Sequence, residues 1–230
     1  MNNNVYLAAG LANGNINIYD SNTGSLISNL TGHSGLVLDL ILISDENLLA
    51  SSCVDKTIRI WNLTTNTNKF ILSGHTAQVN GLKLVSCDVL ASASLDKSLK
   101  LWNIKNGTLI RNHTGHSQTI GWSVDLLNDF NILLSGSYDQ SIKKWDINTG
   151  VCLNTINVGL SIKSLAVLNI TISSKKNFPI NNRYLYHKKC AKSFNFQMID
   201  TLTIKQLKLF KKGAFFYVAP FLRRPFIVTV

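Results

Sequence analysis

Short apolar runs alternate with polar turns along the first two thirds of the chain. Residues 36–43 are almost continuously apolar, as expected for a strand buried on both faces, and residues 48–53 form a second short run. In residues 57–61, isoleucines alternate with polar side chains, which is the period of a strand with one buried face. No segment before the C-terminal region shows the apolar period of about 3.6 residues that marks a helix. The pattern predicts an all-β chain.

Two sequence markers recur with one period. Gly-His pairs lie 42 and 41 residues apart, at Gly32-His33, Gly74-His75 and Gly115-His116. An aromatic residue followed by Asn or Asp recurs at intervals of 42, 41 and 43 residues, at Tyr19-Asp20, Trp61-Asn62, Trp102-Asn103 and Trp145-Asp146. Six positions before each aromatic residue stand Asn13, Asp55, Asp96 and Asp139, and ten positions before it stand Ala9, Ser51, Ser92 and Ser135. Agreement at so many positions predicts repeated units of four short strands.

These residues resemble the WD-repeat family, in which each repeat of about 40–45 residues forms one four-stranded blade of a β-propeller. The resemblance covers about residues 4–157, although the first unit has Ala9, Asn13 and Tyr19 where the family prefers Ser, Asp and Trp. We predict a partial repeat over 1–31, full repeats over 32–73, 74–114 and 115–157, and a degenerate fifth-repeat start with an irregular basic tail over 158–230.

The number of repeats predicts an incomplete propeller of about four blades. Members of the family mostly close a ring with seven, which needs roughly 290 residues. Residues 162–168 could form an inner strand that completes the first unit and closes a four-bladed ring. We instead expect an open arc, belonging to a fragment of a longer WD-repeat protein, whose exposed edge strands favour self-association.

Each full unit contains a His, a Ser and an Asp, the residue types of a hydrolase triad. The resemblance implies a different role, a buried hydrogen-bonded network with Trp that ties the strands of a blade together. The three predicted networks are His33, Ser51, Asp55 and Trp61; His75, Ser92, Asp96 and Trp102; and His116, Ser135, Asp139 and Trp145. An enzyme would need one site with an exposed nucleophile, and no phosphate-binding loop or metalloprotease motif is present. We expect no catalytic residues, no metal and no cofactor.

The predicted function is therefore that of a protein-interaction scaffold or adaptor. Loops on a rigid scaffold carry binding residues, and the residues that follow each Gly-His pair should line one rim. These candidate partner-binding residues are Ser34, Gly35, Thr76, Ala77, Ser117 and Gln118. Trp122, on a predicted inner strand, could also line a binding surface, although packing is the commoner role. An alternative is a regulatory repeat domain of a larger enzyme whose catalytic part lies outside this chain.

Two further side chains have simpler interpretations. His113 falls on a predicted outer strand, and we expect it at the surface. Cys53 falls on a second strand of a blade, and we expect it to be a small core residue.

The net charge of +11 comes from the C-terminal region. Residues 1–157 hold ten Lys and Arg against eleven Asp and Glu, whereas residues 158–230 hold thirteen against one. Aromatic residues interleaved with basic ones suit stacking on single-stranded nucleic acid, and residues 201–212 could form a basic amphipathic helix on an acidic membrane. A third interpretation, which we favour, is that the natural sequence ends near residue 168 and that the rest comes from a shifted reading frame or a retained non-coding segment. Nucleic-acid or membrane binding is thus an alternative function that depends on the tail.

The remaining signals concern location. The four cysteines form no C-x-x-C pair, which fits a reducing compartment better than a disulfide framework. The N-terminus lacks the features of a signal peptide, and no apolar run approaches the roughly 18 residues of a membrane span. We expect an intracellular protein, cytoplasmic or nuclear, that is neither secreted nor membrane-spanning.

Overall fold

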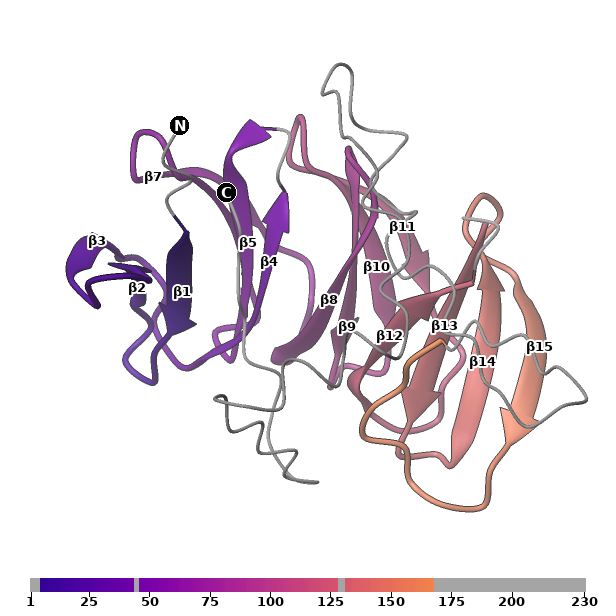
Figure 1. The fold of residues 1–230 in the computed structure, drawn as a ribbon. Coiled ribbons are helices and arrows are strands. Elements are labelled where there is room, and N and C mark those ends of the chain that lie inside the picture. The colour runs from indigo at the N-terminus through magenta and orange to yellow at the C-terminus, as the bar shows by residue number, and fades with distance from the viewer. Residues whose placement is uncertain (1–4, 44–45, 128–130, 168–230) are drawn as a thin grey trace, which may run out of the picture.

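The computed structural model describes residues 5–43, 46–127 and 131–167. In these residues it contains fifteen β-strands, which form four antiparallel sheets that stand side by side in Figure 1. Blade 1 contains β1 (Tyr6–Gly10), β2 (Ile16–Asp20) and β3 (Leu26–Leu30). Blade 2 contains β4 (Val37–Ile43), β5 (Leu48–Cys53), β6 (Ile58–Asn62) and β7 (Thr67–Leu72). Blade 3 contains β8 (Val79–Ser86), β9 (Val89–Ser94), β10 (Leu99–Asn103) and β11 (Thr108–His113). Blade 4 contains β12 (Ile120–Leu126), β13 (Ile132–Ser137), β14 (Ser141–Asp146) and β15 (Cys152–Asn157). The all-β prediction is confirmed.

Every blade is a meander, because strands that are consecutive in the chain are neighbours in the sheet. The turn between the second and third strands of a full blade depends on an aspartate. In blade 2, the Asp55 Oδ1 atom accepts hydrogen bonds from the backbone N–H and the hydroxyl of Thr57, at 3.0 and 2.7 Å. Lys56 lies between them in the left-handed region, with φ of 71°. The side-chain bonds compensate for this unfavourable backbone conformation and fix the direction in which β6 starts.

The hydrophobic core is divided among the contacts between successive blades. Trp61 packs in the core between blades 1 and 2, Trp102 between blades 2 and 3, and Trp145 between blades 3 and 4. All three indole rings are almost fully buried. Blades 2 and 3 therefore each use one face against the preceding blade and the other face against the following one, which makes the arc a chain of nearest-neighbour contacts.

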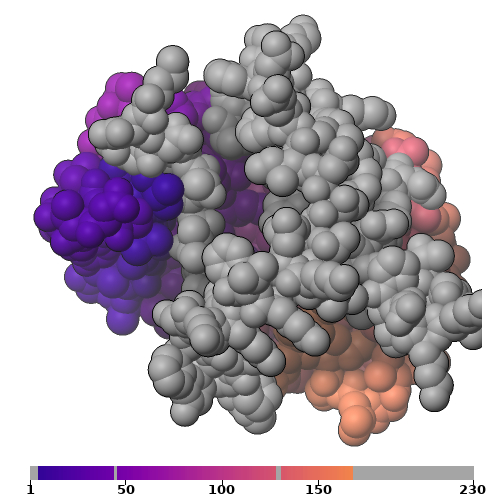
Figure 2. Space-filling view, in the orientation of Figure 1, coloured from indigo at the N-terminus to yellow at the C-terminus, as the bar shows by residue number. Residues whose placement is uncertain are grey.

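The arc is open. Blade 1 has three strands among the described residues, and β1 precedes its aromatic residue by the same spacing as β5 precedes Trp61, so the strand that blade 1 lacks is the innermost. Blade 1 and blade 4 lie on opposite sides of the molecule (Figures 1 and 2).

Residues 158–167 extend blade 4 without adding a strand to it. The backbone N–H of Ile162 donates to Ser137 O, and that of Trp122 donates to Lys163 O, both at 3.0 Å. Residues 162–167 have no regular strand conformation, so the strand expected over 162–168 is wrong for its described part, and residue 168 lies outside the described residues. The segment runs beside β12 and not beside β1, because its backbone is hydrogen-bonded to blade 4, and it does not close the ring.

Candidate functional site

The four predicted network residues of each full blade lie within hydrogen-bond distance of one another. In blade 2, Trp61 Nε1 donates to Ser51 Oγ at 2.8 Å, Ser51 Oγ contacts His33 Nε2 at 2.8 Å, and His33 Nδ1 contacts Asp55 Oδ2 at 2.8 Å. The corresponding distances are 2.8, 2.8 and 2.7 Å for Trp102, Ser92, His75 and Asp96. They are 2.8, 2.7 and 2.7 Å for Trp145, Ser135, His116 and Asp139.

The available protons determine the direction of each bond. The indole N–H of Trp61 can only donate, so the Ser51 hydroxyl accepts it and keeps its own proton to donate to His33 Nε2. The Asp55 carboxylate can only accept, so His33 donates to it from Nδ1. A neutral histidine protonated on Nδ1 satisfies every member of the chain, and this arrangement assigns the tautomer.

Burial favours the neutral form of His33 and His116, and hydrogen bonds favour the ionised form of Asp55 and Asp139. Burial lowers the pKa of His33 and of His116, although their aspartate partners oppose the change. Burial alone would raise the pKa of Asp55, but hydrogen bonds from Thr57 and His33 outweigh it and hold that pKa well below its usual range. The same balance of burial against hydrogen bonds lowers the pKa of Asp139 to about 2.

These Ser, His and Asp side chains do not offer a nucleophile to a substrate. Ser51, Ser92 and Ser135 are fully buried, and each Oγ atom already accepts a bond from an indole. A nucleophilic serine must reach a substrate carbonyl beside an oxyanion site. The chemistry available to the three sets is therefore internal hydrogen bonding, and we propose that their role is to stabilise the blades.

The networks also hold the predicted rim in place. The residue after each histidine donates its backbone N–H to the same carboxylate oxygen that the histidine binds: Ser34 to Asp55 at 3.1 Å, Thr76 to Asp96 at 3.0 Å and Ser117 to Asp139 at 3.1 Å. The side chains of Ser34, Thr76, Ser117 and Gln118 are exposed, whereas Gly35 and Ala77 are half-buried. Each of these loops joins the outer strand of one blade to the inner strand of the next, so the three lie along one rim of the arc.

An exposed tryptophan stands on one inner strand. Trp122 on β12 is 44% exposed, whereas the three network tryptophans are about 1% exposed. A Cβ atom added at Gly81 would lie 3.3 Å from the Cα atom of Trp122, so the backbones of β8 and β12 approach closely there. Leu36, immediately before β4, is also 41% exposed. Both side chains offer apolar contact area beside the rim loops.

The structure corrects the prediction for His113, which is 1% exposed. Its ring meets Trp145 edge-on, with centroids 5.8 Å apart, and its ring nitrogens lie near backbone groups of Asp146 and Leu99 without forming a hydrogen bond of regular geometry. A sequence signal for this burial exists. His113 stands eleven positions after Trp102, and the same offset in blades 1 and 2 gives Leu30 and Leu72, which are both core residues.

Cys53 is fully buried, as predicted, and it lies near two network residues. A ring nitrogen of His33, Cys53 Sγ and an Asp55 carboxylate oxygen lie within 4.8 Å of one another, which is a spacing that could hold a metal ion. Cys53 Sγ, however, donates to Gly35 O at 3.1 Å, and burial raises the pKa of its thiol to about 11. Metal binding would require the thiolate and would break a hydrogen bond of the network, so hydrogen bonding is the better use of these atoms.

Blade 1 has no equivalent network among its described residues. Ala9 and Asn13 replace the serine and the aspartate, and the hydroxyl of Tyr19 accepts a bond from Asn17 Nδ2 at 2.8 Å. The basic tail, on which the alternative of nucleic-acid or membrane binding depends, lies outside the described residues from 168 onward. Within the described part of the chain, no helix has the length and hydropathy needed to span a membrane.

Comparisons with known proteins agree with this geometry. The family model described as "WD domain, G-beta repeat" matches residues 24–62, 66–103 and 107–146, which together make up just over half of the chain. WD repeat and SOCS box-containing protein 1 of Xenopus tropicalis is 45% identical over 71 residues, which are 30% of this chain and 17% of that protein. WD repeat-containing protein pop1 of Schizosaccharomyces pombe is 39% identical over 70 residues, 30% of this chain and 9% of that protein.

A solved structure extends the likeness to the arrangement of the blades. The WD40 β-propeller domain of Doa1 superposes with a TM-score of 0.60 at 26% identity, over 69% of this chain and 53% of that one. The matched region thus corresponds to about half of that propeller and to less than a fifth of the two relatives.

Proposed function

The chain belongs to the WD-repeat family, and we propose that it acts as a non-enzymatic protein-interaction scaffold whose partner docks on the rim that follows the Gly-His pairs. WD-repeat propellers generally bind other proteins, and family membership supports that general role. The rim is the more specific part of the proposal. Its residues are Ser34, Gly35, Thr76, Ala77, Ser117 and Gln118.

The observation that carries the proposal is the attachment of each rim loop to a buried network. Three successive loops repeat one geometry, in which a backbone N–H is fixed on a carboxylate that is itself bound to a buried histidine. A loop that is already ordered loses less conformational entropy when a partner binds. Exposed polar side chains on such loops, next to the apolar surface of Trp122 and Leu36, match the mixed character of protein interfaces.

The name of one relative supports a role in assemblies. "WD repeat and SOCS box-containing protein 1" names WD repeats together with a second unit in one protein. In our proposal the repeats of this chain likewise supply a recognition surface to a larger assembly. The partner is another protein, bound through the rim.

The rim can be tested with a paired set of variants. Cross-linking mass spectrometry on wild-type protein in cell extract would identify partners whose cross-links map to residues 34–36, 76–78 and 117–122. The double variant Thr76→Ala, Gln118→Ala should reduce recovery of those partners at least tenfold and leave the Tm unchanged, because both side chains are exposed.

The matched control changes two exposed polar residues on outer strands, Asn29→Ala and Asn112→Ala. It should leave partner recovery unchanged. Equal losses in the rim and control variants, or cross-links confined to the outer strands, would overturn the assignment of the rim.

A further inference from the structure

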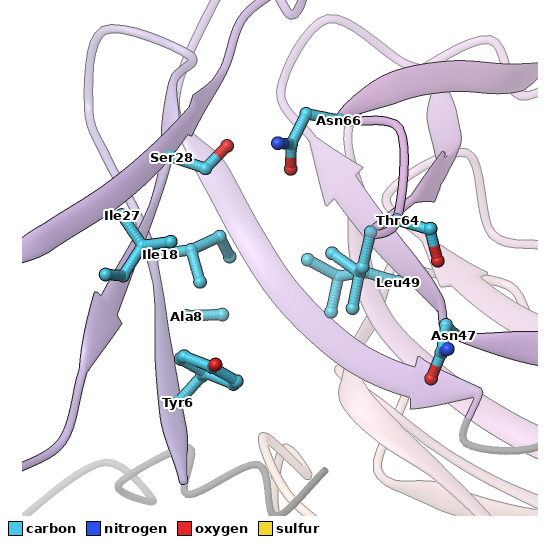
Figure 3. Close-up of a pocket in the computed structure, with 10 residues that line it drawn as sticks. Tyr6, Ala8, Ile18, Ile27, Ser28, Asn47, Leu49, Thr64 and Asn66 are labelled. Atoms are coloured by element: carbon cyan, nitrogen blue, oxygen red, sulfur yellow. The ribbon is translucent and has the colours of Figure 1, made fainter. Parts of the chain in front are cut away.

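A cavity of about 240 Å³ lies between blades 1 and 2, away from the rim (Figure 3). Its apolar walls come from β1, β2, β5 and the loop after β6, through Ala8, Ile18, Leu49 and Leu63. The other lining residues are uncharged: Tyr6, Ile27, Ser28, Asn47, Thr64 and Asn66. Asn47, Thr64 and Asn66 belong to the loops β4–β5 and β6–β7, which lie on the edge of the blade opposite the Gly-His loops.

The same space exists between blades 2 and 3, where the chain fills it with a phenyl ring. Counted from the aromatic residue of each blade, the walls Ala8, Ile18, Leu49 and Leu63 correspond to Ala50, Ile60, Leu90 and Ile104. Those four residues all belong to the core cluster against which Phe70 packs. Phe70 stands nine positions after Trp61, and the residue at that offset in blade 1 is Ser28. The cavity is therefore the site of a phenyl ring that blade 1 does not provide.

The facing residue changes together with the missing ring. Five positions after Trp102, Gly107 gives the ring room, since a Cβ atom there would lie 2.9 Å from Phe70 Cδ1. The corresponding residue opposite Ser28 is Asn66, whose side chain projects toward Ser28 across the cavity (Figure 3).

The contact between blades 3 and 4 again pairs a large side chain with a glycine. Arg111 stands nine positions after Trp102, and Gly150 stands five positions after Trp145. The Arg111 side chain covers Gly150, with Cδ 2.8 Å from the position of an added Cβ atom. Of the three contacts between blades, only the one between blades 1 and 2 has a small residue at the first position, Ser28, and a residue other than glycine at the second, Asn66.

From this repeat we propose that the cavity is a binding site for a phenyl side chain presented by a protein partner. Its volume is sufficient, because apolar cavities of about 150 Å³ hold a benzene ring. Its lining holds no charged residue, which favours an uncharged group. The hydroxyl of Ser28 and the amides of Asn47 and Asn66 can hydrogen-bond to the main chain that carries the ring. Exposed Leu26 and Ile27 on β3 continue the apolar surface beside the cavity.

The test uses the full chain, methyl-labelled, and N-acetyl-phenylalanine amide as the probe. Titration should shift the NMR signals of the Ile18, Leu49 and Leu63 methyl groups and give nuclear Overhauser contacts from the probe ring to them. The methyl groups of Leu133, in the equivalent contact between blades 3 and 4, should not shift. N-acetyl-alanine amide, which lacks the ring, should shift none of these signals.

A second measurement restores the internal ring. The double variant Ser28→Phe, Asn66→Gly recreates the pair formed by Phe70 and Gly107, so it should raise the Tm by several degrees and abolish the shifts. The control variant Ser28→Ala, which leaves the cavity empty, should keep the NMR shifts. Wild-type protein that shows no shifts, shows the same shifts with the alanine probe, or keeps its shifts in the double variant would overturn the proposal. These outcomes are independent of the rim, because Thr76→Ala, Gln118→Ala leaves the cavity unchanged.

Discussion

Replacing Asp96 by asparagine should destabilise the protein strongly, although the two side chains have the same shape. All four bonds that the structure shows on the Asp96 carboxylate come from donors. Oδ2 accepts from His75 Nδ1 and from the backbone of Thr76, and Oδ1 accepts from the backbone and the hydroxyl of Ser98. An asparagine amide offers one oxygen and one nitrogen. Whichever way it is turned, its N–H group faces a donor.

The magnitude follows from the more favourable orientation of the new amide in Asp96→Asn. With its nitrogen turned toward Ser98, the serine hydroxyl rotates to accept, and only the Ser98 backbone N–H loses its partner. That loss costs about 1–3 kcal/mol, and the bond from His75 loses its charge assistance, a further ~1 kcal/mol. Because the Asp96 side chain is only 6% exposed, water restores little of this. We expect the free energy of unfolding to fall by about 2–4 kcal/mol.

The assay is urea unfolding followed by tryptophan fluorescence, with far-UV circular dichroism to show that the native fold is kept. The matched control is Asp88→Asn, which breaks the ion pair with Lys105 at 2.9 Å. Both partners of that pair are more than a third exposed, and exposed pairs contribute about 0–1 kcal/mol. If Asp96→Asn and Asp88→Asn lower the midpoint equally at similar m-values, the networks do not stabilise the blades and the structural role proposed for them is wrong.

The remaining predictions concern a buried histidine, pH and one tight turn. His113→Leu should raise stability by about 1–2 kcal/mol in urea unfolding, since it removes two buried nitrogens that form no hydrogen bond of regular geometry among the described residues; a loss of stability would contradict it. Burial lowers the pKa of His113 in the folded state, so protonation favours the unfolded state as the pH falls below about 6.5. The free energy of unfolding of His113→Leu should therefore fall less than that of wild type between pH 7 and pH 5. Hydrogen bonds lower the pKa of Asp139 to about 2, so the ionised carboxylate stabilises the folded state fully above about pH 4 and loses this effect toward pH 2. The difference in urea midpoint between wild type and Asp139→Asn should therefore shrink from pH 4 to pH 2. A constant difference would show that the Asp139 carboxylate is not held ionised by the network. Gly107→Ala should lower the free energy of unfolding by about 1–3 kcal/mol, because φ is 73° and the added methyl group meets Phe70. Gly24→Ala, with φ of 70° and open space around the methyl group, should lower it less in the same urea unfolding assay. Equal losses would show that the contact with the Phe70 ring does not matter.

The membership of the networks was predictable because it depends on a count along the chain. Trp61, Ser51 and Asp55 lie on adjacent strands of one meander or in the turn that joins them, so fixed offsets bring them together in every full blade. The general position of the strands was predictable for the same reason, and β5 begins and ends where the apolar run 48–53 does. Periodicity thus determined the fold, the four side chains of each network and the loops that those networks hold.

Contacts between blades were less predictable. They join residues from two different repeats, and the spacing within one repeat does not determine which side chains of the next repeat they meet. His113 has the polarity of a surface residue, yet its position on β11 directs it against Trp145 of the next blade. The run 162–167 has the composition of a strand, but it lies beside β12 without strand conformation.

By itself, the amino-acid sequence determined the repeating unit, because each blade is built from local hairpins whose strands, turns and hydrogen-bonded side chains recur with one period. Only the tertiary structure decided what lies between the units. Ser28 and Asn66 are ordinary polar residues in two different repeats, and a cavity forms because the packing of one blade against the next brings them to the same place. The close approach of β8 and β12 at Gly81 is likewise a contact between two repeats, and Trp122, whose backbone makes that contact, is 44% exposed.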